Sequence, residues 1–203
     1  DPAEFYRLAS APTPGLLAQV PWLVLPKGAS LEGYLWADTY RVLADTSAEE
    51  LIVMILNRFR EVVGEERMTV PEARGLTFHQ VVTLASVVEQ EVIVADEAPL
   101  VAGVYQNRLA KKMLLQADPT LHYATDTLAL AKLPVADWVS YVFWKPLEAT
   151  YAEVKFPKAL RGFQTYQNVG LIPGPICTPS LAALDAALEP DRKSTRLNSS
   201  HIT

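Results

Sequence analysis

Apolar residues recur at helical spacing through the middle of the chain, and the recurrences begin and end at residues that favour helix termini. Ser47 and Glu50 fit a capping box, in which their side chains satisfy amide groups at a helix start, and Gly64 suits the end of that helix. Further helices are predicted over residues 77–92, from Pro99 to Lys111, over a short stretch from Asp118–Pro119, and from Thr178–Pro179 to Leu188.

The remaining segments lack helical spacing. Residues 31–42 mix aromatic and branched side chains in a strand-like way, residues 69–75 read as a linker, and residues 133–168 predict irregular structure with short strands. Together these patterns predict an α+β fold, rich in helix between residues 47 and 125 and poor in strands.

Composition narrows the classes of function. The net charge is −5 and no basic run occurs, which excludes a nucleic-acid partner because phosphate binding needs clustered Lys and Arg. Cys177 is the only cysteine, so no intrachain disulfide is possible, and no apolar stretch is long enough to span a bilayer. The three histidines have no metal-ligand spacing and no nucleophile motif is present, so no metal and no cofactor are expected.

Glu89 falls on the apolar side of a helical wheel drawn for residues 77–92, whereas Glu91 falls outside that side, towards solvent. Burial disfavours a charged carboxylate and raises its pKa. A carboxyl that keeps its proton near neutral pH is what a general acid needs to protonate a glycosidic oxygen. On the wheel alone, an ion pair with an Arg such as Arg108, or a place at the wet edge of the stripe, explains Glu89 better than a catalytic role does.

Several ordered motifs surround this residue. LASVVEQEV (residues 84–92), EAPLVAGVYQNRL (97–109) and LLQADPTLHYA (114–124) resemble the core of the endolytic murein transglycosylase family, also called YceG-like. FQTYQNVGLIPGPICTPSLAALDAAL (163–188) is similar to its second signature, and LEGYLWADTY (31–40) to an upstream one. The chain departs from the family at Phe163–Gln164, where Tyr-Asn is usual, and at Ile172, which replaces a common Pro.

The resemblance implies a lytic transglycosylase. Such enzymes cut peptidoglycan between N-acetylmuramic acid and N-acetylglucosamine without water, because the C6 hydroxyl of the muramoyl sugar attacks its own C1 and leaves a 1,6-anhydro end. The catalytic glutamate implied is Glu89. An internal hydroxyl removes the need for the carboxylate nucleophile of ordinary glycosidases, so one Glu suffices. We expect its carboxyl in a cleft, against apolar side chains of its own helix, with Gln116 or Asn107 nearby.

The same motifs assign substrate-binding residues at polar positions, namely Asn107, Gln116, Asp118, Thr165 and Tyr166. Asp118 is equally explained as a helix cap, and Tyr166 as a core or rim residue. The rival interpretation of the whole chain is a non-catalytic module that binds glycan or a partner of the cell-wall synthesis machinery.

The resemblance also sets expectations for the chain's organisation. Residues 1–30 are expected to be a remnant of an upstream LysM-like region, and residues 31–190 a catalytic domain truncated at its C-terminal end. Residues 191–203 are expected to be a non-native tail that does not pack on the domain. The partners implied are peptidoglycan glycan strands and peptidoglycan synthases. The full-length protein is expected in the cell envelope, held in the cytoplasmic membrane by an N-terminal helix that this sequence lacks.

Overall fold

The computed structural model describes residues 1–73 and 75–191 of the 203-residue chain. Its α-helices are α1 (Pro2–Ser10), α2 (Pro14–Gln19), α3 (Ala48–Val63), α4 (Glu65–Ala73), α5 (Phe78–Glu91), α6 (Ala98–Ala110), α7 (Asp118–Leu130) and α8 (Leu181–Leu188). Short 3₁₀ turns occur at η1 (Ala95–Glu97), η2 (Val135–Ser140), η3 (Tyr151–Glu153) and η4 (Arg161–Phe163). The β-structure in these residues is one isolated antiparallel bridge, Leu114 to Val169, so the helix-rich class with few strands is confirmed.

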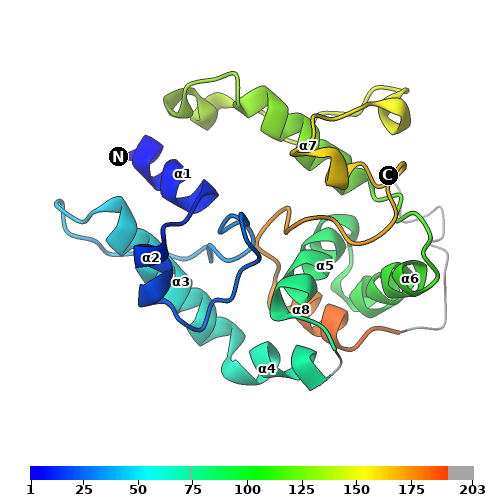
Figure 1. Ribbon diagram of the computed structural model, residues 1–203, viewed down its shortest axis with the longest axis horizontal. Coiled ribbons are helices and arrows are strands. Elements are labelled where there is room, and N and C mark those ends of the chain that lie inside the picture. Colours follow the sequence, from blue (N-terminus) through cyan, green and yellow to red (C-terminus); the bar gives the residue numbers. More distant parts are fainter. Residues whose placement is uncertain (74, 192–203) are drawn as a thin grey trace.

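Helix α5 lies at the centre of the molecule and contacts α4, α6, α7 and α8 (Figure 1). Every side chain from Val81 to Val88 is buried. The polar side chains among them bond to their own helix: Thr83 donates to the His79 carbonyl at 2.7 Å, and Ser86 to the Thr83 carbonyl at 2.8 Å. The central part of α5 therefore has no solvent face, and a helical wheel cannot assign one side of it to water.

Most predicted helices are confirmed together with their caps. Ser47 and Glu50 form the expected capping box at α3, and Gly64 ends that helix with a φ of 79°. Helix α5 begins with a second capping box, made by Thr77 and Gln80. Two details of the sequence-based interpretation were wrong. Helix α8 is capped by Ser180 rather than two residues earlier, and α7 runs for 13 residues with Ala117 at its cap position.

The predicted linker over residues 69–75 was wrong, because most of it belongs to α4. Pro71 lies inside this helix and removes one amide donor from it. Tertiary contacts compensate: α4 touches α3, α5 and α8, and Arg67 donates to both carboxylate oxygens of Asp185 on α8, at 2.6 and 2.9 Å. A fork of two parallel bonds of this kind stabilises one geometry strongly.

The strand-like prediction for residues 31–42 was also wrong. No partner strand lies beside this segment in the described part of the chain, and Gly33 turns it with a φ of 87°. Tyr34 is fully buried instead, with its ring 5.3 Å from that of Phe59 and its hydroxyl 2.9 Å from Nδ1 of His79. An aromatic side chain that fills a helical core gives the same sequence pattern as a strand.

Two ends of the chain frame this core. Residues 1–30 contain α1 and α2, which pack on α3 through apolar residues such as Leu8 and Leu16; their assignment to a LysM-like remnant stays a prediction. Of the predicted tail, residues 192–203 lie outside the described residues, and the amide of Asp191 donates to the Pro99 carbonyl at 2.8 Å.

No described helix is both long and apolar enough to cross a membrane.

Candidate active site

The C-terminal end of α5 carries a half-buried carboxyl in contact with a buried phenol. Tyr105, which is fully buried on α6, donates from its hydroxyl to Oε1 of Glu91 at 2.7 Å. Burial raises the pKa of Glu91, and the nearby charge of Asp118 adds to the rise, while the Tyr105 hydrogen bond and the charge of Arg108 oppose it. The net effect favours a carboxyl that keeps its proton to higher pH than an ordinary Glu.

Asp118, the first residue of α7, stands next to this carboxyl and has its own phenol partner. The hydroxyl of Tyr166 donates to Oδ1 of Asp118 at 2.5 Å, and the hydroxyl of Tyr151 lies 3.3 Å from that of Tyr166. The two tyrosine rings meet edge to face at 5.3 Å. Because Asp118 makes no cap bond to its own helix, the capping explanation of this residue was wrong.

Thr165 fixes the start of α7 against the segment that carries Tyr166. Its side chain is 1% exposed, and its hydroxyl accepts from the Ala117 amide at 3.0 Å and lies 2.9 Å from the Thr120 hydroxyl. The Gln116 amide donates to the Thr165 carbonyl at 3.1 Å. Gln116 itself has a φ of 51°, a conformation rare for a residue with a side chain and common near functional sites. Thr165 therefore positions Asp118 from within the core.

Glu89, the acid that the motif resemblance predicts, contacts the start of α8. Its Oε2 accepts hydrogen bonds from the amide of Ser180 at 3.0 Å and from the Ser180 hydroxyl at 2.6 Å. Ser180 is the cap residue of α8, so the Glu89 carboxylate ties the end of α5 to the start of that helix. The positive end of a helix dipole favours an acidic group there.

The predicted binding residues fall into two groups. Asp118, Thr165 and Tyr166 are joined by the contacts above, with Gln116 exposed beside them. Asn107 instead lines a separate cavity of about 390 Å³ between α4, α5 and α6, with Leu76 and Gln80. The reason is helix geometry: Asn107 comes two residues after Tyr105, so it lies about 200° further round α6 and cannot face the same side.

The sequence interpretation missed three residues. Glu91 was placed in solvent, which was wrong, because α6 and α7 cover the end of α5. Tyr105 lies in a quoted motif, and an aromatic residue inside the predicted helix that follows the two glutamates was its signal. Glu32, in the upstream motif, has a carboxyl whose pKa is raised by burial, and a lone carboxylate among apolar residues was its signal.

Comparison with known proteins gives concordant results. The sequence profile of the YceG-like family matches residues 6–197. The chain is 32% identical over 186 residues to the endolytic murein transglycosylase of Streptococcus pneumoniae serotype 2, covering 91% of this chain and 30% of that protein. It is 32% identical over 163 residues to the endolytic murein transglycosylase of Bacillus subtilis, covering 80% of this chain and 39% of that protein.

A solved structure shares the fold. The crystal structure of a YceG-like protein from Listeria monocytogenes superposes with a TM-score of 0.76 at 28% identity, covering 98% of this chain and 62% of that one. The chain thus spans well under half the length of these two curated relatives and about three fifths of the solved structure.

Proposed function

We propose that this chain, which belongs to the YceG-like family, carries a lytic transglycosylase site that cuts peptidoglycan between N-acetylmuramic acid and N-acetylglucosamine and leaves 1,6-anhydro ends. The names of its relatives support this activity, and a substrate in the cell wall places the site in the cell envelope. Anchoring by an N-terminal helix and contact with peptidoglycan synthases stay predictions.

One observation carries the chemical part of the proposal: the carboxyl of Glu91 is half-buried, is bonded by the Tyr105 hydroxyl and has a pKa raised by burial. A general acid for glycosidic cleavage needs a carboxyl that is still protonated near neutral pH. Tyr105 engages Oε1 of Glu91, so the proton of the neutral acid belongs on Oε2. We therefore place the acid at Glu91.

The reaction needs only this one acid. Glu91 gives its proton to the leaving oxygen as the bond from C1 of the muramoyl sugar breaks. The C6 hydroxyl then attacks C1, and its proton passes to the Glu91 carboxylate, which restores the acid. Positive charge develops at the sugar ring during such a step. The carboxylate of Asp118, held by Tyr166, is suited to stabilise that charge.

Glu89 remains the acid that the motif resemblance predicts. Its carboxylate is engaged twice by Ser180, which supports a structural role at the α5–α8 junction. The two assignments make opposite forecasts for matched Gln variants at positions 89 and 91.

The activity itself is tested by digesting purified peptidoglycan in heavy-oxygen water and analysing the fragments by mass spectrometry. The proposal expects anhydro ends that contain no heavy oxygen, because no water enters the products. Reducing ends labelled with heavy oxygen would show a hydrolase instead. A folded chain that binds the polymer and releases nothing would favour the non-catalytic binding module.

A further inference from the structure

A large cavity opens at the C-terminal end of α5, where Gln90 lines it next in sequence to the proposed acid Glu91. Its volume is about 1020 Å³, and its walls come from α1, the segment around Glu32, the start of α3, α7, the turn η2 and the segment 176–178. Gln90, the residue between the two glutamates of α5, belongs to its lining. A cavity of this size is at the upper end for small ligands and has room for more than one sugar ring.

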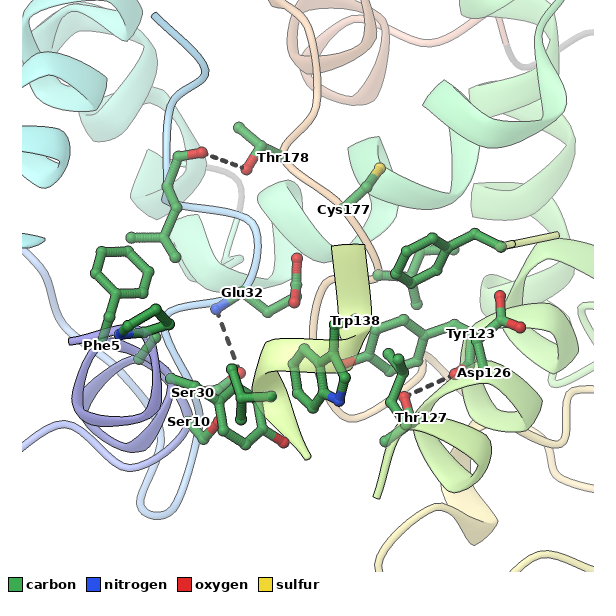
Figure 2. A pocket seen from close by; sticks show the side chains of 18 of the residues that line it. Phe5, Ser10, Ser30, Glu32, Tyr123, Asp126, Thr127, Trp138, Cys177 and Thr178 are labelled. Carbon is green, nitrogen blue, oxygen red and sulfur yellow. Dashed lines mark hydrogen bonds between the residues drawn. The ribbon is translucent and has the colours of Figure 1, made fainter. Parts of the chain in front are cut away.

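One carboxyl in this cavity has no side-chain partner. Figure 2 shows Glu32 directed into the space between Phe5 of α1 and Tyr123 of α7. Burial raises the pKa of Glu32, and only a hydrogen bond from the Gly33 amide opposes it. A carboxyl that is buried with only one backbone partner costs stability unless something uses it. It is ready to donate a hydrogen bond to a ligand or to accept one.

Aromatic rings form the opposite wall. Trp138 of η2 and Tyr123 of α7 both line the cavity (Figure 2). Tyr6 meets Trp138 edge to face, with their ring centroids 4.5 Å apart. Asp126 holds this wall in place, since its carboxylate accepts from the Tyr141 hydroxyl at 2.7 Å and from the Trp144 amide at 3.1 Å. Asp126 is therefore occupied, and the third carboxyl of the lining, Asp1, caps α1 by accepting from the Ala3 amide at 2.9 Å. Glu32 is the carboxyl that is directed into the cavity.

The charge of the lining selects the class of ligand. Among the described residues, no Lys, Arg or His lines the cavity, which disfavours phosphate and other anions. No three metal-ligating side chains gather anywhere in the described residues, so the lining offers no metal-ion site there. A neutral ligand whose rings have apolar faces and carry hydroxyl and amide groups suits this lining. The carboxyl can hydrogen-bond to the polar groups, and the aromatic side chains can pack on the apolar faces.

We propose that this cavity is a saccharide subsite that holds neutral N-acetylhexosamine units of the glycan strand, with Glu32 as hydrogen-bond partner and Trp138 as stacking platform. This subsite deepens the proposed function and rests on it, because the strand would run from the cavity past Gln90 to Glu91. Its role is binding rather than chemistry.

The test measures binding without cleavage. The probe is the neutral tetramer of N-acetylglucosamine, titrated by calorimetry into the Glu91→Gln chain. Trp138→Ala and Glu32→Ala, each added to that background, are expected to weaken binding by about tenfold or more, the loss typical of a central aromatic or buried polar contact. The matched controls are Val139→Ala, an exposed neighbour on η2, and Glu153→Ala, an exposed carboxylate, and both should bind as before.

The subsite would be overturned if the tetramer did not bind. It would also be overturned if both variants, shown by urea unfolding to be folded, bound the tetramer as tightly as their background. A third contrary result would be variants that lose affinity only for a free stem peptide, used as a second probe, and not for the tetramer. The subsite and the proposed function fail separately. Anhydro ends released by the unmodified chain, together with indifferent tetramer binding, would remove the subsite alone. Tetramer binding that depends on Trp138, without anhydro products, would remove the transglycosylase activity alone.

Discussion

Replacing Gly33 by Ala should destabilise the fold more than any ordinary loop substitution. A Cβ at this position would lie 2.4 and 2.6 Å from two carbons of Pro175 and 3.1 Å from Cγ1 of Val82. The φ of 87° adds backbone strain of about 1–2 kcal/mol for a residue with a side chain. Crowding in a packed core costs a further 1–3 kcal/mol, roughly, which gives a total loss of about 2–5 kcal/mol.

Gly28→Ala is the matched control, because Gly28 has a φ of 80° and no atom within 4 Å of its added Cβ. Only the strain term applies there, so the two variants isolate the crowding against Pro175. Urea unfolding gives both losses from the shift in midpoint, provided the slope is unchanged. Gly33→Ala should lose about 1–3 kcal/mol more than Gly28→Ala. Equal losses would mean that the segment around Pro175 is not held against α5 as described.

Three further predictions concern buried polar groups. Burial lowers the pKa of His79, so the stability that its neutral form supports is complete above its unfolded pKa of about 6.5 and is lost as the pH falls below it. Between about pH 7.5 and about pH 5.5, the free energy of unfolding in urea should fall less for His79→Gln than for the unmodified chain, and an equal fall would refute this. Tyr105→Phe removes the bond that lowers the pKa of Glu91, so the alkaline limb of the cleavage profile should move to higher pH; an unmoved limb would contradict the pairing. Thr165→Val leaves the buried Ala117 amide without its acceptor and should cost about 1–3 kcal/mol in urea unfolding, whereas an unchanged midpoint would argue against its structural role.

The helices that were predicted correctly are those whose ends are set by capping residues close in the sequence. Ser47 with Glu50, and Gly64 at the far end, fix α3 through contacts within one turn. The failures involve contacts between distant segments. Nothing near Pro71 indicates that Arg67 meets Asp185, 118 positions later, and nothing near Tyr34 shows that its ring enters a helical core.

The site follows the same rule. Asp118, Thr165 and Tyr166, which the motif resemblance selected, lie together in the structure, and their role in substrate binding stays a prediction. The helical wheel failed at Glu91 because it assumes water on one side of a helix. Because α6 and α7 close over the end of α5, the carboxyl of Glu91 that the wheel assigned to solvent meets Tyr105. The position of a residue on the wheel therefore could not predict the surroundings of the two glutamate carboxyls, because the packing of the neighbouring helices sets them.

The choice between those glutamates is tested most directly by the rate of release of anhydro ends from purified peptidoglycan by the unmodified chain, Glu91→Gln and Glu89→Gln. Both substitutions keep the shape of the side chain and remove its acid, so they differ only in position. Loss of a general acid lowers the rate by about 10²-fold or more, and we expect this loss in Glu91→Gln with folding intact. Glu89→Gln should retain most of its rate with some loss of stability. A Glu91→Gln chain that cleaves at the normal rate, while folded Glu89→Gln is inactive, would contradict the account and return the acid to Glu89.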